Sequence, residues 1–182
     1  MQTDQALQTD QLRSMSLSVG TGSLRSMLPL LAILFMGLFL RIHDLGTKSI
    51  WLDEAISVGL AKSTLPQMFT TLATEKPHVP LYFTILHFWV MLFGDSEAAV
   101  RSLSALFGFL ALLATYKVAS LLFDREVGAL SSLILGLSDF HIYYSQETRM
   151  YSLLVLLTLL SMYFFVKVMK AAGFTASILY IL

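Results

Sequence analysis

The sequence predicts an all-α, polytopic membrane protein. Of its 182 residues, 56% are hydrophobic and 13% are charged, whereas a soluble domain carries about 25% charged residues. The mean hydropathy is +0.72, and Leu- and Phe-rich runs recur along the chain. The formal net charge is zero, so no basic surface indicates a nucleic-acid partner. The sequence contains no cysteine, which excludes a disulfide framework and thiolate chemistry.

The chain is expected to begin with a polar tail that precedes a membrane helix. Residues 1–26 are rich in Gln, Thr and Ser and have too little apolar content to offset the entropy of folding, so we expect them to be disordered. The apolar run 27–42 opens a transmembrane module that covers residues 27–182. No small-residue cleavage pattern follows this run, so it is expected to remain as an uncleaved helix, with Arg41 snorkelling at its end.

A loop region with short helices is predicted next. Residues 65–74, "LPQMFTTLAT", place four apolar side chains on one helical face, which is typical of a helix lying in the membrane interface; they are Leu65, Met68, Phe69 and Leu72. Two prolines in "EKPHVPLYF" then forbid a continuous helix at that point. An apolar run over residues 79–93 follows.

Three further apolar runs complete the predicted elements. Residues 98–123 are long enough to cross a membrane, 127–137 form a brief run, and 151–168 form a clear span that Lys167 and Lys170 close. The chain ends inside another apolar run, so we expect it to be truncated on its C-terminal side. The runs 79–93 and 127–137 are short for crossings, and the basic residues around the first span do not determine orientation.

An acidic pair, Asp53 and Glu54, stands among apolar residues in "SIWLDEAISVG". In a helix, adjacent side chains diverge by about 100°, so only one of the two carboxylates can closely face a single site. The alternative interpretation is an interfacial helix whose acidic residues favour its N-terminal end after Ser49.

A histidine, His78, lies where the two-proline segment meets the start of an apolar run. Because helix starts attract anions, a phosphate near this entrance is physically reasonable. The alternative is a loop histidine at the water interface. His87, nine residues further along, is interpreted as a packing histidine.

Polar and aromatic residues alternate in "HIYYSQETRMY", which covers residues 141–151. If this segment is helical, Glu147 shares a face with Tyr144 and Tyr151, and Arg149 lies about 200° round from Glu147. The planar guanidinium of arginine binds phosphate oxygens bidentately, so an Arg among tyrosines at the membrane edge suits a lipid phosphate headgroup. The alternative is that Glu147 favours a first helical turn and Arg149 snorkels.

The remaining ionisable residues are expected to have structural roles. Arg101 and Lys117 are interpreted as interface anchors of the 98–123 run. The sequence contains no glycine-rich phosphate loop and no metal-ligand spacing of the two-histidine-plus-acid type.

Four segments in order resemble a known family: "WLDEA" after a first membrane helix, "HVPLYF", "FGDSEAAVRSLSALFG" and "IYYSQETRMYSL". Together they are similar to the dolichyl-phosphate-mannose–protein mannosyltransferase-like superfamily, the polytopic C-type glycosyltransferases. The resemblance covers about residues 28–168. It implies that the chain holds the N-terminal transmembrane helices of such a module, with an extracytoplasmic loop that bears short interfacial helices.

The resemblance also assigns expected roles to individual residues. Asp53 is implied as the general base, with Glu54 as its catalytic neighbour, and a divalent metal ion is compatible with Asp53 and His78 as candidate ligands. In "HVPLY", Val79 replaces the first proline of the family's usual pattern. The residues expected to bind the substrate are His78, Tyr82, Tyr144, Gln146, Glu147, Arg149 and Tyr151.

The activity that the resemblance implies is transfer of a hexose or pentose from a polyprenyl phosphate to an acceptor hydroxyl, with inversion. The protein is expected in the plasma or inner membrane, with both acidic motifs on the extracytoplasmic side. An even number of crossings must then separate the two motifs, so one of the runs 79–93 and 127–137 is expected to be a partial segment. Because family members are much longer, a companion chain would supply the missing helices.

Two other interpretations remain. The first is a non-catalytic truncated subunit or a remnant of such an enzyme, which joint expression with a companion chain would distinguish. The second is a transporter fragment whose buried ions line a pathway. Binding of a labelled polyprenyl-phosphate sugar would separate a transferase from a transporter.

Overall fold

The computed structural model describes residues 28–74 and 80–172, and within these ranges all regular secondary structure is α-helical, which confirms the predicted fold class. The predicted tail 1–26 and the last apolar run lie outside the described residues. The helices are Leu28–Ile42, α2 (Leu52–Lys62), α3 (Leu65–Thr74), α4 (Pro80–Phe93), α5 (Glu97–Leu122), α6 (Arg125–Leu137), α7 (Asp139–Ser145) and α8 (Tyr151–Ala172).

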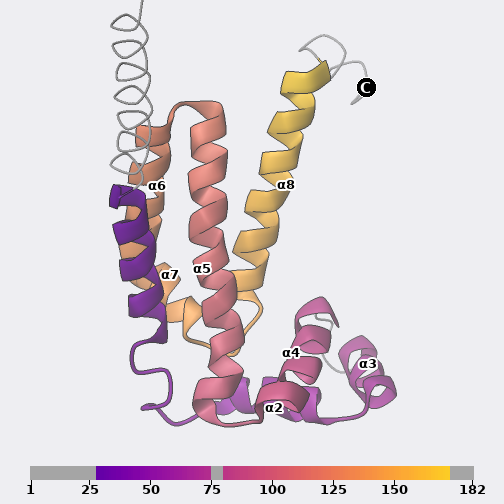
Figure 1. Cartoon of the computed structure of the whole chain (residues 1–182). Helices are drawn as coiled ribbons and strands as arrows, with labels where there is room; N and C mark the ends of the chain where they lie inside the picture. The colour runs from indigo at the N-terminus through magenta and orange to yellow at the C-terminus, as the bar shows by residue number, and fades with distance from the viewer. Residues whose placement is uncertain (1–27, 75–79, 173–182) are drawn as a thin grey trace, which may run out of the picture.

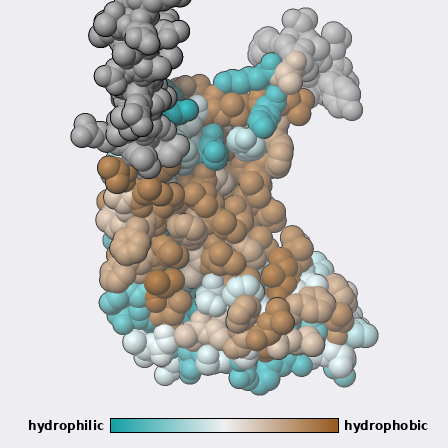
Figure 2. Space-filling view, in the orientation of Figure 1, coloured by the Kyte–Doolittle hydropathy of each residue, from teal (hydrophilic) through white to brown (hydrophobic). Residues whose placement is uncertain are grey.

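The long helices stand side by side as a bundle, and α2, α3 and α4 gather at one end of it (Figure 1). The chain passes from this end along α5, returns along α6 and α7, and leaves again along α8. By length and composition, α5 and most of α8, Tyr151–Ala171, are able to cross a membrane, whereas Leu28–Ile42 and α4 are shorter apolar helices. On the face that Figure 2 shows, an apolar band lies between polar ends of the bundle, as expected of a polytopic membrane protein.

Side-chain caps explain where the bundle helices begin. The Ser96 hydroxyl accepts a hydrogen bond from the backbone N–H of Ala99 at the start of α5. At the start of α6, the Asp124 carboxylate accepts from the backbone N–H groups of Glu126 and Val127. These hydrogen bonds satisfy N–H groups that have no partner inside the helix, and they place the start of α6 two residues before the predicted apolar run.

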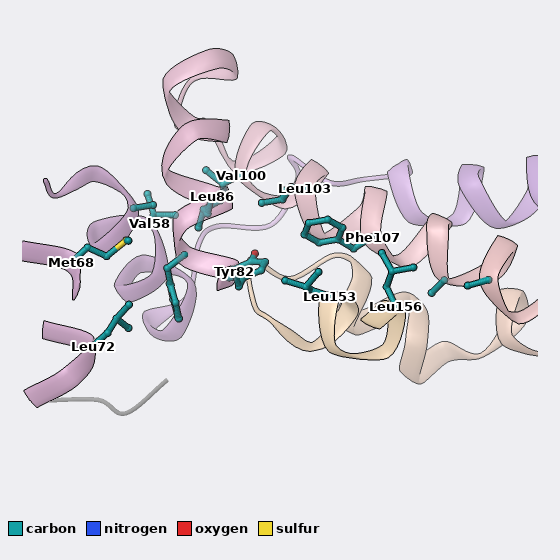
Figure 3. Packing of buried hydrophobic residues seen from close by; sticks show 14 residues of the cluster. Val58, Met68, Leu72, Tyr82, Leu86, Val100, Leu103, Phe107, Leu153 and Leu156 are labelled. Carbon is teal, nitrogen blue, oxygen red and sulfur yellow. The ribbon is translucent and has the colours of Figure 1, made fainter. Parts of the chain in front are cut away.

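A single hydrophobic core connects the α2–α4 end with the bundle (Figure 3). Met68 of α3 and Leu86 of α4 are fully buried, and the cluster continues through Leu103 of α5 to Leu156 of α8. Because these side chains pack on one another, the short helices are fixed relative to α5 and α8 and do not form a separate loop layer.

The structure corrects the interpretation of α3. Its bounds agree with the prediction, but of the four apolar side chains Met68 and Leu72 are buried in the core and Leu65 packs partly buried against it. Phe69 alone of the four is largely exposed, at 44%. The apolar face that suggested a helix on the membrane surface therefore packs mainly against the protein.

Arg41 is also placed differently from the prediction. Its side chain is fully buried rather than snorkelling. The guanidinium donates hydrogen bonds to the carbonyls of Gly37, Leu135 and Gly136 over 2.8–3.3 Å, and its Nη2 lies 2.7 Å from Nδ1 of His141. Carbonyl groups at the end of α6 provide the acceptors that solvent would otherwise supply, so Arg41 joins the first helix to α6 and α7.

The interpretation of His87 as a packing histidine is confirmed. Its Nδ1 lies 2.7 Å from the carbonyl oxygen of Ala61, and the ring is partly buried between α4 and α2. Because a carbonyl oxygen only accepts, Nδ1 carries the proton and donates it.

Candidate functional site

The acidic pair lies in the first turn of α2, which begins at Leu52 after Trp51. The helix therefore begins two residues later than in the alternative interpretation, in which it starts after Ser49. The side chain of Trp51 makes no cap hydrogen bond. The side chain of Glu54 is 1% exposed and that of Asp53 is 42% exposed. The divergence of adjacent helical side chains thus turns Glu54 inward and leaves Asp53 accessible.

Glu54 forms a buried, bidentate ion pair with Arg101 of α5. Nε of Arg101 donates to Oε1 of Glu54 over 2.9 Å, and Nη2 donates to Oε2 over 2.6 Å. The backbone N–H of Thr148 also donates to Oε1, over 2.9 Å. This carboxylate therefore connects α2, α5 and the segment before α8.

The other N–H groups of Arg101 hold the loop that precedes α2. Nη1 donates to the carbonyls of Leu45 and Lys48, and Nη2 donates to the carbonyl of Ser49, over 2.7–3.2 Å. All five N–H donors of the guanidinium are thereby used. The interpretation of Arg101 as an interface anchor is wrong, because its side chain is 5% exposed and bound inside the protein.

Two opposing effects act on the pKa of Glu54. Burial alone would raise this pKa, but the hydrogen bonds from Arg101 and from the Thr148 backbone stabilise the carboxylate, and the net result is a pKa below the ordinary value. Glu54 consequently stays ionised and fully engaged, which suits a structural anion rather than a proton acceptor.

Asp53 lies beside Arg149. The two residues are far apart in sequence, because Asp53 precedes α5 and Arg149 follows α6 and α7. Oδ2 of Asp53 is 3.6 Å from Nη1 of Arg149, longer than a hydrogen bond, and the Arg149 side chain is 16% exposed. The guanidinium carbon lies 5.7 Å from the centroid of the Tyr151 ring, and Tyr151 contacts the Tyr144 ring at 4.7 Å. Arg149 thus contacts one tyrosine ring, Tyr151, which in turn contacts Tyr144.

Residues 146–150 are not helical, so the predicted shared faces of Tyr144, Glu147 and Tyr151 are wrong. Helix α7 ends at Ser145 and α8 begins at Tyr151. Between them the chain turns tightly, with the N–H of Arg149 donating to the carbonyl of Glu147 over 2.8 Å. Hydrogen bonds to distant parts of the chain outweigh the helical preference of this segment. One of them runs from the backbone N–H of Thr148 to the carboxylate of Glu54.

Two predicted substrate residues have structural partners. The side-chain amide of Gln146 donates to the carbonyls of Leu40 and His43 over 3.0 and 2.9 Å, at the end of the first helix. Tyr82 is 1% exposed. Its hydroxyl lies 2.9 Å from Oγ of Ser104, which donates to the carbonyl of Arg149 over 3.2 Å. These contacts position the segment that carries Arg149.

A pocket of about 220 Å³ opens beside the buried ion pair and is lined by residues before and at the start of α2 and by residues in and after α7. Trp51 and Tyr143 form aromatic walls, and Lys48 and Glu147 contribute charged groups. Glu147 is 6% exposed. Its burial, together with the nearby Glu54, raises its pKa above the ordinary value, although Tyr143 lies within hydrogen-bonding reach.

The candidate metal ligands are Asp53 and His78. His78 lies outside the described residues, which stop at position 74 and resume at 80. In the part of the chain that the structure describes, no group of three or more His, Asp or Glu side chains is arranged to hold a metal ion. Asp53 instead has a guanidinium as its neighbour, so the described residues around it do not fit a metal centre.

The sequence did not indicate three features of this region: the Glu54–Arg101 pair, the buried Arg41 and the pocket beside Trp51. One signal was present, since an acid flanked by Leu52 and Ala55 in a helix needs an internal counter-charge when it is buried. The first turn of α5 carries Arg101 and could have been named as that partner.

An apolar helical bundle with an accessible carboxylate and an arginine at one end defines a polytopic membrane protein with a polar site at the edge of its apolar belt. Residues 75–181, more than half of the chain, match the family described as dolichyl-phosphate-mannose-protein mannosyltransferase, and the chain belongs to this family of glycosyltransferases. The matched region includes Arg149 and begins after Asp53. No curated protein and no solved structure matches the chain.

Proposed function

We propose that this protein transfers a sugar from a polyprenyl-phosphate donor to the hydroxyl of an acceptor, with inversion at the anomeric carbon. Family membership supports the general activity. The observation that carries the site assignment is the 3.6 Å approach of Asp53 and Arg149, which are 96 positions apart in sequence, with Asp53 exposed and Glu54 sequestered by Arg101.

The proposed reaction is a single displacement. The acceptor oxygen attacks the anomeric carbon and its proton passes to the carboxylate of Asp53, while the bond from the anomeric carbon to the phosphate oxygen breaks and its electron pair leaves with the phosphate. Arg149 binds the departing phosphate through its guanidinium. Since a phosphate is already a good leaving group, this pair of residues supplies the base and the cation that the oxocarbenium-like transition state needs.

The long contact between Asp53 and Arg149 suits this order of events. A donor phosphate is a stronger partner for the guanidinium than a half-exposed carboxylate at 3.6 Å. Donor binding would therefore draw Arg149 away from Asp53 and leave the carboxylate to accept the proton of the acceptor. Glu54, which was expected to be catalytic, acts in this proposal as a positioning residue.

The distribution of basic residues supports an extracytoplasmic site. Lys117, Arg125, Lys167 and Lys170 lie at the far end of α5, α6 and α8. These four side chains are exposed. Of the Lys and Arg residues that the structure describes at the site end, only Lys48 and Lys62 are exposed, because Arg41, Arg101 and Arg149 are bound inside the protein. Basic residues favour the cytoplasmic side, so we place the far end in the cytoplasm and the site on the outer side of the plasma or inner membrane.

The test is transfer from a radiolabelled polyprenyl-phosphate sugar in membranes that contain the chain, alone and together with a companion chain. We expect Asp53→Asn to reduce transfer by a factor of about 10²–10⁴, the usual contribution of a general base. Asp95→Asn is the matched control, because Asp95 is an exposed acid paired with Lys62 over 2.5 Å at the same end of the molecule. Transfer at the wild-type rate by Asp53→Asn would remove Asp53 from the role of base.

A further inference from the structure

The pocket beside the Glu54–Arg101 pair lies next to the proposed reacting groups without including them. Glu54 lines it from the position after Asp53, and Glu147 lines it from two positions before Arg149. Glu147 is close enough to interact electrostatically with both Asp53 and Arg149. A ligand in this pocket would thus sit beside both halves of the reaction site.

The walls of the pocket combine aromatic faces with hydrogen-bond acceptors. Trp51 and Tyr143 are 47% and 53% exposed, so their rings are open to a ligand. Glu147 is more than nine-tenths buried as a residue and lines the same space. An ionised carboxylate only accepts hydrogen bonds, and it prefers hydroxyl or ammonium donors. Aromatic faces with buried acceptors suit a ring that has both C–H faces and hydroxyl groups.

The charges around the pocket leave one carboxylate unbalanced. Arg101 neutralises Glu54 in a direct ion pair. Asp44 and Lys48 contribute opposite charges to the lining. Among the residues that the structure describes, no basic side chain forms an ion pair with Glu147. The lining therefore carries one net negative charge, which lies at Glu147.

From the aromatic walls, the buried acceptor and this charge balance, we propose that the pocket binds one monosaccharide ring that is neutral or carries an amino group, and that Glu147 disfavours an acidic sugar. The volume of about 220 Å³ is below the roughly 300–1,000 Å³ of sites for drug-sized ligands, which suits one ring rather than an oligosaccharide. The assignment rests on the proposed glycosyl transfer for its biological meaning, but binding itself does not require turnover.

Trp51 provides a direct reporter of ligand binding. The chain has two tryptophans, and Trp89 lies outside the pocket, where its indole N–H donates to the Ala99 carbonyl and to Ser102. We would titrate the purified full chain in detergent with methyl mannoside, glucosamine and glucuronate and record tryptophan fluorescence. We expect a saturable change with the first two sugars, and affinity for glucosamine at least about tenfold greater than for glucuronate, from the charge of Glu147.

Single variants test whether the fluorescence change arises from Trp51 and whether Glu147 causes the preference for glucosamine over glucuronate. The fluorescence change should persist in Trp89→Phe and disappear in Trp51→Phe. Glu147→Gln keeps the shape of the side chain and should reduce the preference for glucosamine over glucuronate to less than about threefold, since the charge difference is removed. Tyr143→Ala, at an exposed position, removes one aromatic wall and should weaken binding of all three sugars, which gives a second test where Glu147→Gln fails to fold. Asp139→Asn, an exposed acid outside the lining, is the matched control and should change nothing.

Two results would overturn the proposal: no saturable change in the wild-type chain, or an unchanged preference in Glu147→Gln together with unaffected binding in Tyr143→Ala. Competition distinguishes the origin of the sugar. Displacement by a polyprenyl-phosphate sugar, but not by sugar-free polyprenyl phosphate, assigns the pocket to the donor ring, whereas no displacement by either assigns it to an acceptor sugar.

The outcome is separable from that of the proposed function. Asp53→Asn should bind monosaccharides as the wild type does, even though its transfer is lost. Saturable binding without any transfer would support monosaccharide binding in the pocket and contradict the transferase assignment. Transfer without selective binding would support the transferase assignment and contradict monosaccharide binding in the pocket.

Discussion

The two carboxylates of the first α2 turn have different surroundings. Each oxygen of Glu54 accepts a hydrogen bond from Arg101, and Oε1 accepts a second one from the Thr148 backbone. The carboxylate of Asp53 lies 3.6 Å from Nη1 of Arg149, which donates to the backbone carbonyl of Asp53 over 3.5 Å. A general base must have a lone pair available to an incoming hydroxyl, and of the two acids Asp53 meets this condition.

Removal of one partner of the buried pair should destabilise the protein strongly. Arg101→Leu leaves the Glu54 carboxylate buried without its cation, so we expect a loss of about 3–5 kcal/mol in the free energy of unfolding. Thermal unfolding in detergent, monitored by circular dichroism, measures the effect. Lys62→Ala removes an exposed ion pair at the same end and should cost no more than about 1 kcal/mol.

The double variant Glu54→Leu/Arg101→Leu tests whether the pair itself carries this cost. We expect it to be more stable than Arg101→Leu alone, since no unpaired charge remains buried. Equal stability of the single and double variants would mean that Arg101 acts mainly through the carbonyls of the 45–49 loop.

The raised pKa of Glu147 predicts that the free energy of unfolding decreases with rising pH, whereas an acid in an ion pair would make it increase. Because the folded-state pKa lies above the ordinary value of 4.5, the folded protein holds this proton to a higher pH than the unfolded chain does. The free energy of unfolding therefore falls as the pH rises above the unfolded-state pKa. Glu147→Gln should be more stable than the wild type at pH 7, with the difference shrinking as the pH approaches 4 in thermal-unfolding scans. A lower stability at pH 7 would contradict this assignment.

At the residue level, the sequence identified Asp53, Arg149 and the tyrosines, because ionisable and aromatic side chains stand out in an apolar chain. It also showed that one of two adjacent acids turns away from the site. It could not show which one, because that depends on where α2 begins, and an uncapped start at Leu52 leaves no side-chain signal.

The close approach of α5 and α7 beside the site depends on a glycine, Gly108. A Cβ on Gly108 of α5 would overlap the side chain of Ser145 at the end of α7 and would lie 3.3 Å from Nε of Arg41. The contact between α5 and α7 therefore leaves no room for a side chain, and displacement of Ser145 would move the segment that carries Glu147 and Arg149.

We expect Gly108→Ala to lower the free energy of unfolding by about 1–3 kcal/mol, as is usual for overpacking, and to reduce transfer at the same time. Gly59→Ala is a matched control in α2, because a Cβ at this position would have no atom within 4 Å of it. Alanine there should stabilise the helix by up to about 1 kcal/mol. Thermal unfolding compares the two variants, and equal effects would show that helix propensity dominates at both positions.

The positions of the main helices were predictable from apolar runs, since those runs fill the core or the apolar belt. The prediction failed for residues 139–150, where α7 ends and a turn begins. There Gln146 and Thr148 bind Leu40, His43 and Glu54, which are all about 100 positions earlier. Such long-range hydrogen bonds leave no local periodicity to recognise.

Across the whole molecule, the site requires Asp53 and Arg149 to lie on the same side of the membrane. Figure 1 shows α5 leaving the site end and α6 returning to it, while α4 stays at that end. In the proposed arrangement, the run 79–93 is therefore the partial segment, and α5 and α6 would provide the even number of crossings. The sequence left this choice open because both runs are shorter than the roughly 20 residues that a spanning helix needs.

The proposed orientation predicts the accessibility of the two loops that flank α5. The chain has no cysteine, so single cysteines can be introduced without a background. Asp95→Cys should react with a membrane-impermeant thiol reagent added from outside, and Arg125→Cys should react only after the cells are permeabilised. Labelling of both positions from the same side would contradict the arrangement of α5.

The hairpin of α5 and α6 also constrains how the protein enters the membrane. With 13 residues, α6 is shorter than the roughly 20 needed to span a bilayer alone. A biosynthetic intermediate in which α5 inserts without α6 would leave residues 138–150 in the cytoplasm and Asp53 outside. In the proposed orientation, Arg149 would then meet Asp53 only after the two helices enter as a unit, so we expect assembly of the site to depend on insertion of the whole hairpin.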